Sequence, residues 1–226
     1  MELYKQVQKG PIMKSVLVYH QMKEALMRGQ WDFGEKISIN ELIEQFKVSR
    51  RPVMDAMKML ENEGFIEIIP QSGCKVIDYV KDEVLEQLFV SSGLESFSAG
   101  LAAVNHTDAE IAALEVYQES IEKNKEKLHD KFFYFNYNRE FHFHIASMTH
   151  LNRIKKLAMQ MWDLNDFYLL NLFDEFQFDV FEQLDYHDKI LGFVKARDQK
   201  RARDVMEEHL HSYINRVREG LPEGRP

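Results

Sequence analysis

The stretch "KVSRRPVMDAMKMLENEGFIEIIPQSGCKV", residues 47–76, decides how the N-terminal part of this chain folds. Pro52 is tolerated in the first turn of a helix, and Gly64 is typical of the residue just past a helix end. The segment between them carries apolar residues at helical spacing. The runs "FIEII" and "CKVI" then alternate apolar and polar residues on either side of "PQSG", which predicts a β-hairpin.

The sequence before this stretch predicts two further helices. "SINE" at 38–41 is a capping box, because the Ser38 hydroxyl can cap a helix start while Glu41 bonds back to it. A gap of two residues separates this helix from the next start at Ser49, so the pair matches a helix-turn-helix. Another helix is predicted over residues 12–28. Three helices followed by a hairpin make a winged helix-turn-helix.

This architecture predicts a surface that binds double-stranded DNA. The first turn of the second helix of the pair enters the major groove, and a planar guanidinium can grip guanine or a phosphate there. Ser49 could cap that helix, whose N-terminus favours a phosphate. The predicted contacts are Lys47, Ser49, Arg50, Arg51 and Met54 on the helix side and Ser72, Gly73 and Lys75 on the wing. The alternative is that both arginines are only solvated surface residues.

Length and charge predict two domains. The chain has 226 residues and a net charge of −8. Residues 1–78 hold 11 basic and 11 acidic side chains, which cancel, so the whole −8 falls on residues 79–226. A neutral N-terminal part can still carry a local basic face. The expected division is a DNA-binding domain at 1–79 and a second domain at 80–226.

The cysteine content and the hydropathy limit the cellular compartment that we expect for this protein. The single cysteine, Cys74, excludes an internal disulfide and fits a reducing environment. No apolar run approaches the roughly 20 residues that span a bilayer, and the start lacks the apolar core of a signal peptide. A cytoplasmic protein with no membrane partner is expected.

The C-terminal two thirds of the sequence predict an all-helical antiparallel bundle of six or seven helices. Turn residues are rare after residue 80, and Thr107 to Glu110 form a second capping box. The expected helices cover residues 82–104, 108–127, 130–148, 151–173, 178–196 and 199–218.

Three of these helices each place one histidine on an apolar face. Asn138 and His142 lie four residues apart on the inward side of one helix, and His187 and His209 lie among apolar residues on two later helices. Neutral imidazoles that converge in a bundle core are good ligands for Zn²⁺, Ni²⁺ or a similar ion such as Mn²⁺. The alternative is three separate, hydrogen-bonded core histidines.

A ligand pocket is expected near these histidines. The candidate lining residues are Tyr134, Tyr137, Trp162, Asn165 and Tyr168. For each of them, ordinary core packing is the alternative.

The opening stretch also resembles the winged-helix signature of the GntR family of bacterial transcription regulators, which runs V-S-R-T-P-V-R-E-A-L. The segment "GQWDFGEKISINELIEQF" resembles the family's preceding run, with Phe33 in the usual proline place. The resemblance implies that Arg50 is the first DNA-contacting arginine. Met54 stands where the second arginine is usual, which would change the operator that is preferred.

The C-terminal part resembles the FCD domain of the FadR-like subfamily. Metal-binding members carry D-x-x-x-H on one helix and a histidine on each of two later helices, which His142, His187 and His209 match. Asn138 stands in the aspartate place, so the resemblance implies a weaker metal site. Ser91 stands where an arginine that grips the ligand is common.

Together these features predict a ligand-responsive transcription regulator. It would bind a short palindromic operator as a homodimer and respond to a small organic acid in the bundle. One alternative is a DNA-binding dimer with no effector. A metal-dependent hydrolase is the other, but the sequence shows no obvious general base beside the histidines, and a hydrolase would leave the N-terminal module unexplained.

Overall fold

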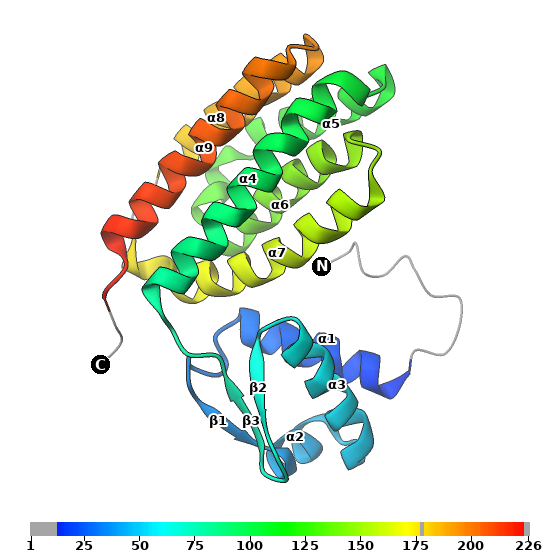
Figure 1. The fold of residues 1–226 in the computed structure, drawn as a ribbon, viewed down its shortest axis with the longest axis vertical. Helices are drawn as coiled ribbons and strands as arrows, with labels where there is room; N and C mark the ends of the chain where they lie inside the picture. The colour runs from blue at the N-terminus through cyan, green and yellow to red at the C-terminus, as the bar shows by residue number, and fades with distance from the viewer. Residues whose placement is uncertain (1–12, 177–178, 224–226) are drawn as a thin grey trace. The chain divides into compact units, whose positions relative to one another are not determined.

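A computed structural model describes residues 13–176 and 179–223, and the chain divides into two compact units, Met1–Tyr79 and Val80–Pro226. Figure 1 shows the helices and strands of each unit. The expected helix starts at residues 12 and 178 lie outside the described residues.

The first unit is a winged helix-turn-helix, as the sequence predicted. Its elements in chain order are α1 (Lys14–Met27), β1 (Lys36–Ser38), α2 (Ile39–Phe46), α3 (Arg50–Asn62), β2 (Ile66–Ile69) and β3 (Gly73–Val76). Helix α1 packs against α3, and the strands form a small antiparallel sheet in the order β1-β3-β2.

Local signals explain where the helices of this unit begin and end. Both hydrogen bonds of the Ser38–Glu41 capping box are present at the start of α2. Lys47 ends α2 in the left-handed conformation, with φ of 52°. Ser49 occupies the N-cap position of α3, but its side chain makes no capping hydrogen bond, contrary to the sequence expectation.

The strand β1 was not predicted, because a run of three residues that ends on the first residue of a capping box carries no readable alternation. It pairs with β3, and Ser38 lies opposite Gly73. A Cβ atom on Gly73 would lie 1.9 Å from the Ile37 carbonyl oxygen. The glycine is therefore required for β1 to approach the wing.

The second unit is the predicted helical bundle. Its elements are α4 (Lys81–Asn105), α5 (Asp108–Glu122), the 3-10 helix η2 (Lys125–His129), α6 (Lys131–Met148), α7 (Asn152–Asn171), the 3-10 helix η3 (Phe173–Glu175), α8 (Val180–Lys195) and α9 (Gln199–Gly220). Helix α4 packs against α6, α7, α8 and α9, and α5 packs against α6 and α8. The helix expected over 108–127 ends earlier, at Glu122.

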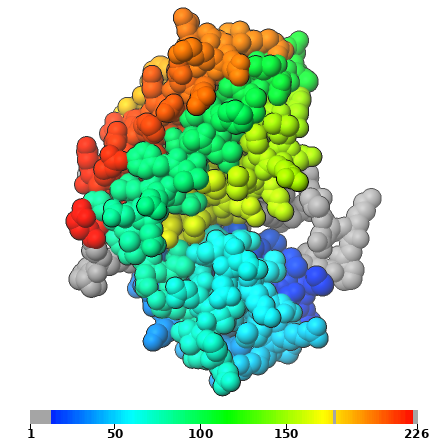
Figure 2. Space-filling model, in the orientation of Figure 1, coloured from blue at the N-terminus to red at the C-terminus, as the bar shows by residue number. Residues whose placement is uncertain are grey.

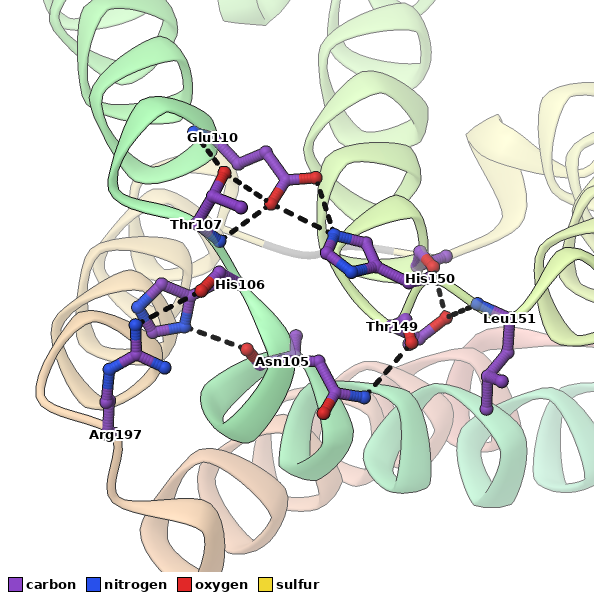
Figure 3. A network of polar contacts seen from close by, with 10 residues as sticks. Asn105, His106, Thr107, Glu110, Thr149, His150, Leu151 and Arg197 are labelled. Atoms are coloured by element: carbon purple, nitrogen blue, oxygen red, sulfur yellow. Dashed lines mark hydrogen bonds and ion pairs between the residues drawn. The ribbon is translucent and has the colours of Figure 1, made fainter.

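A polar network joins the end of α4 and the start of α5 to the junction between α6 and α7 (Figure 3). The Thr107–Glu110 capping box is complete, and Glu110 Oε1 also lies 3.0 Å from His150 Nε2. Asn105 Nδ2 donates to the Thr149 carbonyl oxygen at 3.1 Å. Segments 40 and 44 residues apart in sequence are thereby held together.

Candidate functional sites

The first turn of α3 presents the predicted DNA-contacting arginines to solvent. Arg50 and Arg51 are exposed, and Met54 is half-buried one turn later. Lys47 and Ser49 are exposed in the turn before the helix. The helix-turn-helix therefore has two exposed guanidinium groups where such helices meet bases and phosphates.

The wing residues differ in their surroundings. Ser72 is exposed at the tip of the wing. Gly73 is buried against β1, where a side chain would not fit, so its role in packing is clear from the structure. Lys75 is half-buried, with its Nζ 2.6 Å from Asp78 Oδ2 and 3.6 Å from Glu67 Oε2. Two acidic partners offset the positive charge of Lys75.

The three predicted histidines meet in the core of the helical unit. His142 on α6, His187 on α8 and His209 on α9 are 3%, 0% and 2% exposed. The Nε2 atom of His209 lies 3.2 Å from Nε2 of His187 and 3.3 Å from Nε2 of His142. The three imidazoles thus converge through the same ring atom, from three helices.

These separations fit a shared metal ion. Zinc–nitrogen bonds of about 2.0–2.1 Å in a tetrahedral site place neighbouring ligand nitrogens about 3.3 Å apart. Burial, together with the neighbouring imidazoles, lowers the pKa values of His187 and His209 well below the ordinary value. Both rings are therefore neutral near pH 7, which metal binding requires.

The outer ring nitrogens of two histidines have close partners. His142 Nδ1 lies 2.7 Å from Glu95 Oε2, and Glu95 Oε1 accepts a hydrogen bond from Ser91 Oγ at 2.8 Å. His187 Nδ1 lies 2.6 Å from the Tyr137 hydroxyl. The sequence analysis named Ser91 but not Glu95 or its link to His142. The spacing of four residues between Ser91 and Glu95 on one helix was the available signal.

A small cavity of about 50 Å³ adjoins the cluster. His142, His209 and Asn138 line it, and so do three of the five expected pocket residues, Tyr134, Trp162 and Asn165. The other two, Tyr137 and Tyr168, are not among the lining residues, and neither is His187. Tyr137 instead contacts His187 on its outer side.

The charges around the cavity are unusual for a site that would receive an acid. Among the described lining residues there is no lysine or arginine, whereas Glu95 and Asp166 are both present. The nearby Arg139 is held by Asp166 at 2.8 Å and by Asp163 at 2.5 Å. Its charge is already paired with two carboxylates.

Several buried polar atoms of the lining lack partners in the part of the chain that is described. They are both side-chain amide atoms of Gln183, Oδ1 of Asn165 and Nε1 of Trp162. Buried donors and acceptors without partners cost free energy, so a bound molecule or water would stabilise them. Gln183 lies one turn before His187 on α8, and its position was not recognised from the sequence.

Comparison with known proteins matches both units to one family. The pattern described as "Bacterial regulatory proteins, gntR family" matches residues 14–76, and that of the "FCD domain" matches residues 88–212. The chain belongs to the GntR family of bacterial regulatory proteins. Its N-terminal unit is the family's DNA-binding domain, and its C-terminal unit is an FCD effector-binding domain.

Relatives of this GntR-family regulator include other transcription regulators. It is 24% identical to the uncharacterized regulator YdhC of Bacillus subtilis, with 92% of each chain covered. It is 27% identical to the Uxu operon regulator of Haemophilus influenzae (84% of this chain, 77% of the relative). It is 26% identical to the Gluconate operon transcriptional repressor of Bacillus licheniformis (89% and 82%).

Solved structures share the fold. Escherichia coli McbR/YncC matches with a TM-score of 0.77 at 22% identity, covering 92% of this chain and 98% of that one. A putative GntR regulator from Rhodococcus sp. RHA1 matches with a TM-score of 0.72 at 16% identity, over 92% and 99%. The family and its named relatives are transcription regulators, not enzymes. None of the described helices is long and apolar enough to cross a membrane.

Proposed function

We propose that this regulator responds to a hydroxylated carboxylate that binds a divalent metal ion held by His142, His187 and His209. The observation that carries the proposal is the convergence of three buried Nε2 atoms, 3.2 and 3.3 Å apart, beside a cavity. When bound, the metal would supply a positive charge and open positions for an oxygen ligand.

The charge of the cavity supports a metal-dependent response. A carboxylate that leaves water needs a compensating charge or hydrogen bonds. The described lining has no basic side chain, and Arg139 is paired with two aspartates. Three neutral imidazoles and the neutral amide of Asn138 would leave the metal's charge available to an acidic effector. The metal is then the main source of attraction for the acid.

The unpartnered polar atoms support an effector that also carries hydroxyl groups. A hydroxyl can both donate to and accept from the Gln183 amide, and it can accept from Nε1 of Trp162 or donate to Oδ1 of Asn165. Gluconate is an acid of this kind, and one relative is named a gluconate operon repressor. Polyhydroxylated acids are therefore the first compounds to test.

The same proposal includes a homodimer that binds a palindromic operator through Arg50 and its neighbours. Helix α4 carries exposed apolar side chains at seven-residue spacing: Val90 (63% exposed), Phe97 (47%) and Val104 (51%). Figure 2 shows the outer side of α4 at the surface of the helical unit. A row of this kind is typical of helix pairing, and helix-turn-helix dimers read two half-sites.

Thermal unfolding of chelator-treated protein tests the metal and the acid together. We expect Zn²⁺, Ni²⁺ or Mn²⁺ to raise the melting temperature by several degrees, because a ligand of the folded state at 100 times its Kd adds about 2.7 kcal/mol. Gluconate or a related acid should raise it further only when metal is present.

Two variants sharpen this test. His209→Ala removes a converging ligand and should abolish the metal-dependent shift. His211→Ala, on the same helix but outside the cluster, should keep the shift. If the wild type gains no stability from any of the three metals and elemental analysis finds none bound, the proposal is wrong.

A further inference from the structure

A continuous chain of hydrogen bonds leads from the surface to the buried histidine cluster. Asp188 Oδ1 accepts from Gln118 Nε2 at 2.9 Å. Gln118 Oε1 accepts from the Tyr137 hydroxyl at 3.0 Å, and that hydroxyl lies 2.6 Å from His187 Nδ1. Asp188 is exposed, whereas Gln118, Tyr137 and His187 are buried. The chain joins α5, α6 and α8.

The chemistry of these groups fixes the direction of every bond. An ionised aspartate only accepts, so the Gln118 amide must turn its NH₂ group toward Asp188 and its oxygen toward Tyr137. Tyrosine has one O–H donor, which Gln118 Oε1 takes up. Toward His187 the Tyr137 oxygen can then only accept, and the proton of the contact must be on His187 Nδ1.

A neutral imidazole with its proton on Nδ1 has a free lone pair on Nε2. That atom faces the other two histidines, 3.2 Å from His209 Nε2. We infer that Gln118 and Tyr137, oriented by Asp188, are positioning residues that hold His187 in the tautomer able to bind a metal. This inference rests on the proposed metal site, and it adds three residues on the outer side of His187 to that site.

This chain of Asp188, Gln118 and Tyr137, called the relay below, differs from the groups that contact Nδ1 of the other two histidines. The Glu95 carboxylate lies 2.7 Å from His142 Nδ1, an ion pair by distance and not a hydrogen bond, whereas Nδ1 of His209 has no hydrogen-bond partner among the described residues. A neutral tyrosine orients His187 without placing a charge beside it. Outer partners of this kind typically change metal affinity about 10–100-fold.

The test uses the full-length protein and measures Zn²⁺ affinity by competition with a chelator. Tyr137→Phe removes the acceptor and should weaken binding about 10–100-fold. Gln118→Met is a sharper variant, because the freed Tyr137 hydroxyl can then donate to His187 Nδ1 and favour the wrong tautomer. Tyr117→Phe is the control, since its ring stacks on Tyr137 with centroids 6.1 Å apart but its hydroxyl is outside the relay.

Nitrogen-15 NMR of metal-free protein labelled at histidine gives a readout that a merely structural role would not move. We expect His187 to carry its proton on Nδ1 in the wild type and to shift toward Nε2 in Gln118→Met. Circular dichroism checks that each variant is folded. If Gln118→Met does not fold, Tyr137→Phe, which keeps the ring, still tests the contact to His187.

The outcomes separate this inference from the metal proposal. If both variants bind Zn²⁺ like the wild type and the His187 tautomer does not change, the relay is overturned while the metal site stands. If the wild type binds no metal, the metal proposal fails, and the NMR comparison alone still decides whether the relay sets the tautomer.

Discussion

At the scale of single residues, this chain has a neutral side chain at two positions where the resemblance to the family leads us to expect a charged one. Met54 stands where a second DNA-contacting arginine is usual, and it is half-buried one turn after the exposed Arg50. Asn138 stands in an aspartate's place and lines the cavity beside His142. We expect each of these differences to change what its site binds.

Arg50 and Met54 carry a prediction about DNA. Arg50→Ala should weaken binding to a specific operator, since a bidentate arginine–guanine contact contributes about 1–3 kcal/mol. Met54→Arg should change which operator is preferred, because a thioether can contact a thymine methyl but cannot grip guanine.

Selection of operators from a random library, followed by fluorescence anisotropy at several salt concentrations, measures both effects. Affinity should fall steeply with salt for every variant that contacts phosphates. Equal binding by the wild type and Arg50→Ala would show that the recognition helix is misassigned. An unchanged preference of Met54→Arg would show that Met54 lies outside the groove.

At the scale of elements, the helix ends were readable because their signals are local. The Ser38–Glu41 and Thr107–Glu110 capping boxes each lie within four residues of sequence, and both form as predicted. The strand β1 and the early end of α5 were not readable. The strand β1 depends on residues distant in sequence, because it pairs with β3 at Gly73. At the end of α5, Asn124 Nδ2 donates to the Ser120 carbonyl oxygen at 2.8 Å, a local contact that was not anticipated.

The Thr107 cap carries a prediction about stability. Thr107→Ala should lower the free energy of unfolding by about 1 kcal/mol, because the Glu110 amide loses its acceptor. Urea denaturation measures the change, and Thr107→Ser, which keeps a hydroxyl, should lose much less. An unchanged urea midpoint in Thr107→Ala would contradict this role.

The same cap gives stability a dependence on pH. Burial raises the pKa of Glu110, but hydrogen bonds from Thr107 and His150 outweigh this and leave it below the ordinary value of 4.5. A carboxylate with a lowered folded-state pKa stabilises the protein above its unfolded pKa. This contribution should be lost as the pH falls below 4.5, and Glu110→Gln should remove that part of the acid sensitivity.

At the scale of the whole molecule, the proposed function needs two copies of the chain. The exposed row Val90, Phe97 and Val104 on α4 is the surface that we propose for pairing. Gly93 belongs to the same side of the helix, and a Cβ there would meet nothing within 4 Å. A second helix could therefore approach closely at that point.

Phe97→Glu should convert the dimer to a monomer and weaken binding to a palindromic operator, because a charge would be buried at the interface without a partner. Light scattering after size-exclusion chromatography measures the mass. Val116→Glu, an exposed apolar site on α5, is the matched control and should leave the mass unchanged. A wild type that is monomeric at micromolar concentration would exclude this part of the proposal.

The sequence alone was enough to predict the winged helix-turn-helix, the helical bundle and the inward faces of His142, His187 and His209. These follow from helical periodicity, capping residues and turn residues, which act over a few positions.

Three facts needed the packing of the helices: the three Nε2 atoms meet, Glu95 and Tyr137 lie behind two of the histidines, and the described cavity lining has no basic side chain. Those facts depend on contacts between helices, such as that of His209 with His142, 67 residues apart in sequence. No local pattern encodes which faces of distant helices pack together, and here that packing forms the site.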